Sequence, residues 1–268
     1  MNWWQAILLG LVQGLTEFLP VSSSGHLMIV RELLGVDAEG FLDFTVTVHF
    51  ATVLSTIVVF WAAIWTLLKG VLKFRYNDET DYVCKIVVSM IPVGVVGLMF
   101  KDQVESLFGD SLGTVAVCLL ITAALLVLSD ILTKKINYSN TSRNGISYWQ
   151  ALLVGLGQSL AVAPGLSRSG TTIATGLISG VKRENMAQFS FLMVLVPILG
   201  EQLLDIVDAV SGGFELSLGA GALIFGFISA FLSGLFACKV MVALVKKAKL
   251  SWFALYCAIV AVLILVLA

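Results

Sequence analysis

Residues 3–26 read WWQAILLGLVQGLTEFLPVSSSGH, an apolar segment interrupted near its end by a short polar run. Residues 148–172, YWQALLVGLGQSLAVAPGLSRSGTT, repeat this arrangement 145 positions later. Between residues 4 and 25, 11 of the 22 positions are identical at that offset without a gap. The same offset pairs Phe44 with Phe189 and Leu54 with Leu199, so the sequence indicates two copies of one unit.

The amino-acid composition excludes most classes of soluble protein. Of the 268 residues, 59% are hydrophobic and 12% are charged, whereas soluble domains carry about 25% charged residues. The mean hydropathy is +1.00. So few polar groups do not cover a globular surface, which leaves an integral membrane protein with several helices. The net charge of −1 gives no support for nucleic-acid binding.

The apolar stretches outside the repeated motif are long enough to cross a bilayer, which takes about 20 residues. These six stretches lie near residues 43–68, 83–100, 112–132, 187–209, 217–245 and 250–267. Regions 3–34 and 148–178 are each broken by a polar run, at LPVSSSGH (19–26) and APGLSRSG (163–170), and their halves are too short to cross singly. We therefore predict an all-α integral membrane protein with six transmembrane helices and two re-entrant helical hairpins.

Each repeat contains one hairpin and three spans, with the first repeat over 1–135 and the second over 146–268. Because three is odd, the second copy enters the membrane upside down, as in inverted-topology repeats. This arrangement places eleven basic loop residues on one face and only Lys101 on the other. The eleven are Lys69, Lys73, Arg75, Lys134, Lys135, Arg143, Lys182, Arg183, Lys246, Lys247 and Lys249. The positive-inside rule makes that face cytoplasmic, with both chain ends outside.

The first break contains side chains suited to phosphate chemistry. Glu17 is an ionisable group at membrane depth, where charges are costly and usually functional. Its equivalent at the repeat offset is Val162, so the carboxylate is not needed to build the hairpin. Gln13 lies four residues earlier on the same helix face, placed to orient Glu17 or a bound group. Gln158 repeats it at the offset of 145, so a structural role is the alternative. The alternative for Glu17 is a structural carboxylate bonded to nearby serines.

Three serines and a histidine follow this carboxylate. Ser22, Ser23 and Ser24 precede Gly25 and His26 at the point where a short helix begins. The free N–H groups and the dipole of that helix favour an anion such as phosphate. Serine capping explains one or two of these residues. His26 is suited to act as a nucleophile, a general acid or base, or an orienting group.

The second break supplies a guanidinium. Arg168 has no carboxylate within its own hairpin, so it requires an anionic ligand or Glu17 from the other repeat. Its planar fork matches phosphate oxygens. The remaining polar or helix-breaking residues here are Pro164, Gly165, Ser167, Ser169, Thr171 and Thr172.

Other ionisable residues in the spans have simpler interpretations. His49 has no motif around it and is interpreted as a packed, hydrogen-bonded histidine. Asp130 is expected to pair with a neighbouring lysine. Glu201, Asp205 and Asp208 lie on or near one helix face, either as solvated end charges or as ligands of a divalent cation.

The residues alone leave three function classes open. Paired broken helices in inverted repeats are typical of transporters, so a transporter or lipid flippase is the main rival to an enzyme. A purely structural membrane subunit is the third class. Because Glu17 and His26 lie in one repeat and Arg168 in the other, the asymmetry favours chemistry over transport alone.

The motifs QGLTEFLPVSSSGH (13–26) and PGLSRSGTT (164–172) together resemble those of the bacterial undecaprenyl-diphosphatase family of the bacitracin-resistance type. The first family motif has an acid or an amide, three residues and a glutamate, which Gln13 and Glu17 match with the amide. The second, PGxSRSxxT, is matched in full by Pro164 to Thr172. The resemblance covers the whole chain in length, span count and motif placement.

This resemblance implies an enzyme of the bacterial plasma membrane that removes the terminal phosphate of undecaprenyl diphosphate. That step regenerates the lipid carrier for peptidoglycan synthesis and confers resistance to bacitracin, which binds the same diphosphate. It also implies a divalent cation, Mg²⁺ or Ca²⁺, by family likeness alone. We further expect membrane lipids around the spans, a homodimer, and an active site that opens toward the extracytoplasmic side.

The resemblance also suggests the role of each site residue. Ser23 or His26 would attack the outer phosphorus with Glu17 as base, Ser23 being favoured, and direct attack by water is the third alternative. Arg168 would hold the phosphates as the fourth catalytic residue. The remaining substrate-binding residues would be Gln13, Ser22, Ser24, Gly165, Ser167, Ser169 and Thr172.

Overall fold

The computed structural model describes residues 1–37, 40–100, 111–134, 136, 142–163, 165–211 and 218–267, without the side chains of residues 98 and 201–211. Pro164, Lys101 and Lys135 therefore lie outside the described residues, as do the side chains of Glu201, Asp205 and Asp208. Within the described ranges the secondary structure is helical and no strand occurs. The all-α prediction is confirmed.

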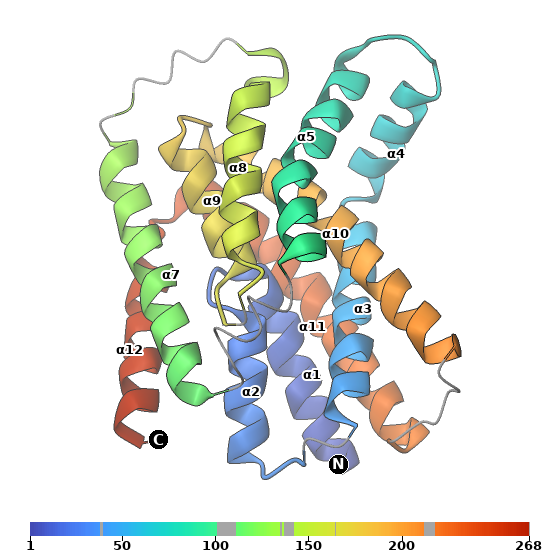
Figure 1. Cartoon of the computed structure of the whole chain (residues 1–268), viewed down its shortest axis with the longest axis vertical. Helices are drawn as coiled ribbons and strands as arrows, with labels where there is room; N and C mark the ends of the chain where they lie inside the picture. The colour runs from blue at the N-terminus through green and yellow to red at the C-terminus, as the bar shows by residue number, and fades with distance from the viewer. Residues whose placement is uncertain are drawn as a thin grey trace.

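The helices follow the expected order along the chain (Figure 1). Their bounds are α1 Trp3–Phe18, α2 Ser23–Leu33, α3 Phe41–Val59, α4 Trp61–Val71, α5 Asp78–Met99, α7 Leu112–Thr133, η1 Arg143–Gly145, α8 Tyr148–Leu160, α9 Arg168–Ile178, α10 Arg183–Ser211, α11 Ala220–Lys247 and α12 Ser251–Leu267. Four of them are long and apolar enough to cross a membrane, namely α3, α5, α7 and α11. The 17 residues of α12 form a shorter apolar helix.

The two broken segments fold into matching helix pairs, α1 with α2 and α8 with α9. The bounds of α2 and α9 differ by 145 positions at both ends, as the sequence offset requires. Gln5 Nε2 donates to the Leu34 carbonyl at 3.2 Å, and Gln150 Nε2 donates to the Ser179 carbonyl at 2.9 Å. These bonds join the first turn of one helix to the end of its partner, so the repeated glutamine fixes how each pair folds back.

The first predicted span, 43–68, is wrong as a single helix because it is divided at Phe60 into α3 and α4. Neither proline nor glycine marks this break. The hydroxyls of Thr52 and Thr56 bond carbonyls of their own helix at 2.7 and 3.0 Å, and such back-bonding bends helices. The Phe60 ring packs on Phe191, 5.9 Å between centroids, which holds the bend.

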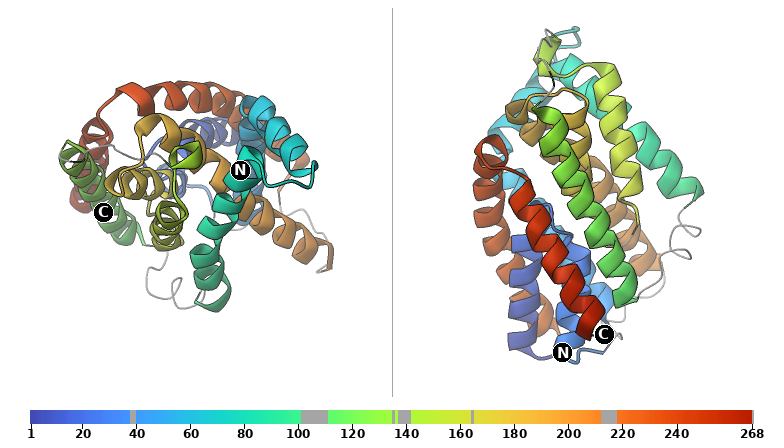
Figure 2. Two further views of the ribbon diagram at one scale, coloured as in Figure 1. Left: turned by 90° about the horizontal axis from the view of Figure 1, so that it is seen from above. Right: turned by 90° about the vertical axis from the view of Figure 1, so that its left-hand side faces the viewer.

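The two helix pairs enter the molecule from opposite ends and meet near its middle. In Figure 1 the α1–α2 pair lies at the end that carries both chain termini, and the α8–α9 pair lies toward the other end. The right-hand view of Figure 2 shows the same arrangement from another side. The Ser169 hydroxyl donates to the carbonyl of Leu19 at 3.0 Å, so the two breaks are in direct contact.

Close packing against α11 fixes the position of α1. A Cβ atom at Gly10 would lie 2.4 Å from the Gly226 carbonyl oxygen, and one at Gly14 would lie 2.5 Å from the Ala230 carbonyl oxygen. Only glycine leaves room for backbones this close, as at other helix contacts in membranes. The helix that carries Glu17 is therefore seated on α11 along much of its length.

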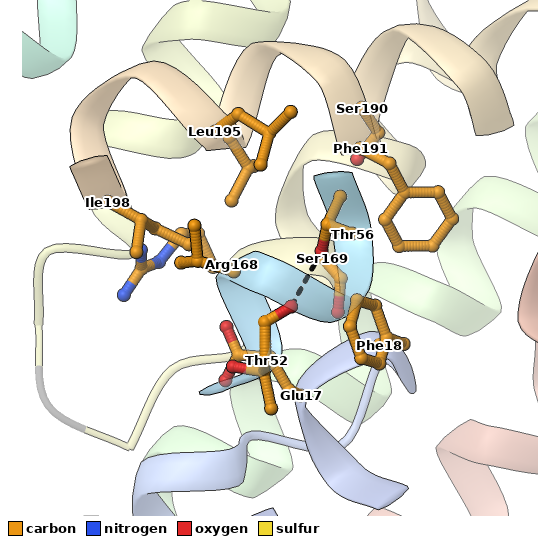
Figure 3. A pocket seen from close by; sticks show the side chains of 12 residues that line it. Glu17, Phe18, Thr52, Thr56, Arg168, Ser169, Ser190, Phe191, Leu195 and Ile198 are labelled. Atoms are coloured by element: carbon orange, nitrogen blue, oxygen red, sulfur yellow. Dashed lines mark hydrogen bonds between the residues drawn. The ribbon is translucent and has the colours of Figure 1, made fainter. Parts of the chain in front are cut away.

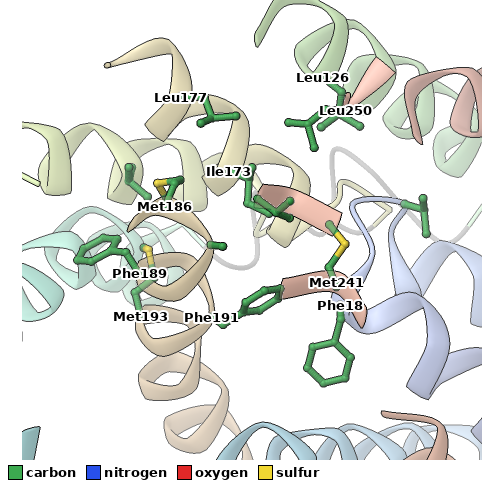
Figure 4. Packing of buried hydrophobic residues seen from close by; sticks show 14 of the residues in the cluster. Phe18, Leu126, Ile173, Leu177, Met186, Phe189, Phe191, Met193, Met241 and Leu250 are labelled. Atoms are coloured by element: carbon green, nitrogen blue, oxygen red, sulfur yellow. The ribbon is translucent and has the colours of Figure 1, made fainter. Parts of the chain in front are cut away.

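The hydrophobic core surrounds the meeting point of the two pairs. Phe18 at the end of α1 packs on Phe191 of α10 with ring centroids 6.0 Å apart. Phe189, Met193 and Met241 are fully buried in the same cluster (Figure 4). Helices in a membrane associate through close van der Waals packing of such side chains, so this cluster holds the two breaks together.

A buried ion pair joins the helices at the end away from the termini. Asp130 accepts hydrogen bonds from Arg183 Nη2 at 2.5 Å and from the Ser251 hydroxyl at 2.7 Å. The expectation of a lysine partner is therefore wrong. Arg183 also donates to the Ala248 carbonyl at 3.0 Å, and a guanidinium makes both bonds because its donors are spread over a planar fork.

Candidate active site

A small cavity lies where the two breaks meet. Glu17 and Phe18 line it from α1, and Arg168 and Ser169 from α9. The remaining wall comes from α3 and α10, with Thr52, Val53, Thr56, Ser190, Phe191, Val194, Leu195 and Ile198. A few polar groups in an apolar pocket are the usual composition of a small-ligand site.

Glu17 is the centre of a hydrogen-bond network. Its Oε2 atom accepts from the Ser23 hydroxyl at 2.5 Å and from Gln13 Nε2 at 2.9 Å. His49 Nε2 lies 3.7 Å from the same oxygen. Gln13 is fully buried and Glu17 is largely buried, so these bonds form out of contact with bulk water. The network holds the carboxylate against the Ser23 hydroxyl.

Arg168 is the first residue of α9, and its side chain reaches into the same cavity as Glu17. Figure 3 shows the guanidinium and the carboxylate on the same side of this cavity. No ion pair within 4 Å is recorded for Arg168 in the described part of the chain. A guanidinium and a carboxylate contributed by different repeats therefore face one space, as the sequence predicted.

Ser22 and Ser167 cap the two short helices that begin at the breaks. The Ser22 hydroxyl accepts from the Gly25 N–H at 3.3 Å, and the Ser167 hydroxyl accepts from the Gly170 N–H at 3.1 Å. The hydroxyls of Ser24 and Ser169 lie 3.4 Å from their respective capping hydroxyls. The first-turn N–H groups of both helices thus point into the meeting point, where they favour an anion.

The backbone at Ser22 is strained, whereas its repeat equivalent is relaxed. Ser22 has φ 68° and ψ 95°, while Ser167 has φ −70°. A residue other than glycine at such an angle costs about 1–3 kcal/mol, and strain of this kind concentrates at functional sites. The strain is confined to the repeat that also carries Glu17 and Ser23.

His26 lies beside the network and contacts α12. Its Nδ1 atom lies 2.8 Å from the Ser22 carbonyl, and its Nε2 atom lies 2.8 Å from the Tyr256 hydroxyl. The two rings stack with centroids 5.6 Å apart. Both ring nitrogens of His26 are thus engaged. Neither His26 nor Ser23 is among the residues that line the cavity, but Ser23 is bonded directly to Glu17, which lines it. The contacts of His26 suit an orienting group better than an attacking one.

Two other predicted residues lie behind the cavity wall. Thr172 is fully buried, and its hydroxyl contacts Ser190 at 2.7 Å and the Arg168 carbonyl at 2.9 Å. Gly165 has φ +87°, a backbone conformation that glycine adopts without strain. A Cβ there would lie 3.3 Å from Cys118. In this structure both residues support the shape of the second break.

Sequence reasoning missed the polar face of α3. Thr45, His49, Thr52 and Thr56 recur at spacings of four, three and four, which places them on one side of a helix. His49 is hydrogen-bonded, as interpreted, through Nδ1 to the Thr45 carbonyl at 2.8 Å. Its other nitrogen faces Glu17, which the interpretation as a packing residue did not foresee. The signal was the recurrence of these four polar residues at helical spacing within α3.

The described side chains do not form a cation site by themselves. Within the described ranges, no three His, Cys, Asp or Glu side chains gather at one point. Glu17 is the one carboxylate that lines the cavity there, and its Oε2 already accepts two hydrogen bonds. The divalent cation expected from the family resemblance therefore remains a prediction, and no reaction step below uses it.

Comparison with known proteins extends the match from the motifs to the full chain. The family model described as bacitracin resistance protein BacA matches residues 6–263. The chain belongs to the BacA family. The two breaks and the cavity between them lie within the matched range.

Similar proteins from several organisms share the name undecaprenyl-diphosphatase. A protein of Bacteroides thetaiotaomicron named undecaprenyl-diphosphatase is 51% identical over 267 residues, 99% of each chain. One of Parabacteroides distasonis with the same name is 52% identical over 260 residues, 97% of this chain and 96% of its own. Another, of Methanobrevibacter smithii, is 38% identical over 273 residues, 97% of this chain and 95% of its own.

Proposed function

We propose that this protein hydrolyses undecaprenyl diphosphate to undecaprenyl phosphate and inorganic phosphate. The observation that carries the proposal is the cavity in which Glu17, bonded to Ser23, faces Arg168. Membership of the BacA family and full-length relatives named undecaprenyl-diphosphatase support a phosphatase over a transporter, flippase or structural subunit. The product is the lipid carrier of peptidoglycan synthesis, and removal of the diphosphate is the proposed basis of bacitracin resistance.

Arg168 and the helix N-termini bind the headgroup. The diphosphate carries several negative charges, and a planar guanidinium donates two parallel hydrogen bonds to phosphate oxygens. The first-turn N–H groups of α2 and α9 add further donors. The Ser169 hydroxyl lines the same cavity but donates to the Leu19 carbonyl. The apolar residues of α3 and α10 on the opposite wall suit the first part of the prenyl chain.

Ser23 is the proposed nucleophile. As its Oγ atom bonds the terminal phosphorus, the bond from that phosphorus to the bridging oxygen breaks, and the electron pair leaves with undecaprenyl phosphate. The Ser23 proton passes to Glu17 Oε2 along the existing 2.5 Å hydrogen bond. Water then attacks the phosphoserine, one of its protons restores the hydroxyl, and phosphate leaves. His26 orients the strained Ser22 turn beside the nucleophile.

We propose that the chain crosses the bacterial plasma membrane six times, with re-entrant hairpins at 3–34 and 148–178. The hydrogen bonds shared by the two helix pairs support repeats over 1–135 and 146–268. Loop charges support a cytoplasmic basic face, both termini outside and an active site that opens to the extracytoplasmic side. Binding of bacitracin to the same diphosphate and a homodimeric state are further parts of the proposal.

Phosphate release from C55 and C15 prenyl diphosphates by the purified protein tests this function. Glu17→Gln keeps the shape of the side chain but accepts no proton, so kcat is expected to fall by about 10²- to 10⁴-fold. A chelator added to the wild-type reaction tests the predicted cation requirement. Failure of the folded wild-type protein to release phosphate from either diphosphate contradicts the proposal.

A further inference from the structure

The imidazole of His49 approaches the catalytic carboxylate from α3, a helix with no signature motif. Its Nε2 atom lies 3.7 Å from Glu17 Oε2. Both side chains are largely buried, with 15% and 12% of their surfaces exposed. Two ionisable groups held this close away from water interact strongly, because the interior screens charge weakly.

The other ring nitrogen fixes the state of this imidazole. His49 Nδ1 lies 2.8 Å from the Thr45 carbonyl oxygen, which only accepts hydrogen bonds. Nδ1 therefore carries a proton, and Nε2 of the neutral ring presents its lone pair to the carboxylate. Two acceptors thus face each other, and a proton on Nε2 converts the contact into an ion pair. In this geometry His49 Nε2 is free to accept a proton from Glu17.

No second carboxylate competes for this role among the described residues around Glu17. Gln13 donates to the same Oε2 atom at 2.9 Å, and an amide does not take up a proton near neutral pH. Arg168 lines the same cavity from α9 with a permanent positive charge. On α10, the described residues that line the cavity are Ser190 and apolar side chains. On the side of α11, the residue next to His49, Phe50, packs its ring on that of Phe227.

We propose that His49 is a positioning residue that receives the Ser23 proton from Glu17 and holds it during turnover. The proposal rests on the phosphatase function described above. When Ser23 attacks, its proton moves to Glu17 and on to His49 Nε2, which leaves an imidazolium beside a restored carboxylate. In the second step water supplies one proton to the Ser23 oxygen and keeps the other on phosphate.

The whole reaction releases one proton, and His49 is the residue that holds it. Hydrolysis of a triply charged prenyl diphosphate by one water gives a doubly charged prenyl phosphate, doubly charged hydrogen phosphate and one proton. His49 holds that one proton until the products leave, and then releases it to solvent. Meanwhile the imidazolium offsets the charge of Glu17 while the anionic products share the cavity.

His26, the histidine of the signature motif, is less suited to this role. Its Nε2 atom is occupied by the Tyr256 hydroxyl at 2.8 Å, on the side of α12. Within the described part of the chain, the imidazole within 4 Å of Glu17 is that of His49.

Steady-state kinetics of His49→Gln separate proton transfer from packing. Glutamine has a similar size and still donates to Glu17, but it accepts no proton at working pH. We expect kcat for C15 prenyl diphosphate to fall at least tenfold, with KM within threefold of wild type. The ratio of variant to wild-type kcat should change between pH 5.5 and 8.5, and substrate ionisation cancels in that ratio. A ratio within threefold of one at every pH overturns the proposal.

A second substitution tests whether the missing group is a proton acceptor. A carboxylate at position 13, in hydrogen-bond reach of Glu17, can share a proton with it. Gln13→Glu in the His49→Gln background should therefore recover at least tenfold in kcat. Thr47→Ala is the matched control on the same helix, since its hydroxyl bonds the Asp43 carbonyl of its own helix and does not line the cavity. Thr47→Ala should stay within twofold of wild type.

A spectroscopic measurement keeps this proposal separate from the phosphatase function. The chain has two histidines, so ¹⁵N-histidine labelling gives two imidazoles, assigned with His26→Gln. Glu17→Gln replaces the acceptor that faces Nε2 by an amide that can donate to it, so it should shift the His49 Nε2 resonance and leave that of His26 in place. An unmoved His49 resonance overturns the pairing whatever the activity. Absent phosphate release from wild type with a responsive His49 overturns the phosphatase instead.

Discussion

Replacement of Arg168 should lower kcat/KM by about 30-fold or more without affecting the fold. Its guanidinium lines the cavity and takes part in no ion pair within 4 Å in the described ranges. Large destabilisation usually follows the loss of a fully buried group or a bonded partner, whereas Arg168 is only partly buried and interacts with Glu17 across the cavity rather than in a close ion pair. We therefore expect Arg168→Lys and Arg168→Ala to keep the thermal unfolding midpoint within about 2 °C of wild type.

The size of the kinetic effect follows from the hydrogen bonds that each side chain can make to phosphate. A hydrogen bond to a charged group contributes about 1.5–3 kcal/mol. Lysine keeps the charge but loses one of the two parallel bonds, so about 2 kcal/mol is lost and kcat/KM falls about 30-fold. Alanine loses both bonds, about 3–6 kcal/mol, which corresponds to roughly 10²- to 10⁴-fold.

The assay is release of inorganic phosphate from C15 prenyl diphosphate by detergent-purified variants. Thermal unfolding of the same samples is followed by circular dichroism. We expect kcat/KM to decrease from wild type to Arg168→Lys and further to Arg168→Ala, while the three proteins share one thermal unfolding midpoint. An alanine variant within threefold of wild type would refute the role of Arg168, and a loss of activity matched by a loss of folded protein would refute the separation of function from folding.

Three further substitutions, one of them paired with a control, test the surroundings of the site. Arg183→Ala breaks the buried ion pair with α7 and should lower the unfolding free energy by about 1.5–3 kcal/mol, with kcat/KM of the folded fraction within threefold of wild type. Gly14→Ala places a Cβ 2.5 Å from a carbonyl oxygen of α11 and should cost about 1–3 kcal/mol, whereas Gly94→Ala, surrounded by open space, should not lower the midpoint. Tyr256→Phe removes the hydroxyl on His26 Nε2, worth about 1 kcal/mol, and should lower kcat/KM about fivefold; an unchanged value contradicts an orienting role for His26.

Local sequence signals predicted the parts of the molecule that repeat. The polar breaks at 19–26 and 163–170 and the offset of 145 residues located both helix pairs to within a few residues. The meeting of Glu17 with Arg168 followed from the inverted arrangement, because each supplied the charge that the other lacked. These predictions needed only chain spacing and charge.

Contacts made across long chain separations escaped prediction. Tyr256 is 230 residues from His26, and nothing in its own segment marks it as a partner. Arg183, rather than a lysine close in the chain, binds the Asp130 carboxylate, because packing brings together the start of α10, the end of α7 and the start of α12. The bend at Phe60 depends on its contact with Phe191 and on threonine back-bonding, not on a helix-breaking residue.

The division of charged groups between the halves has a consequence for how such a molecule arose. The residue equivalent to Glu17 is Val162, and that equivalent to Arg168 is Ser23. Neither half therefore owns a complete set of reactive groups, and a gene fragment encoding one half should be inert alone. Two fragments expressed together should regain turnover only if they assemble. Association of the two halves is therefore as necessary for activity as the reactive groups themselves.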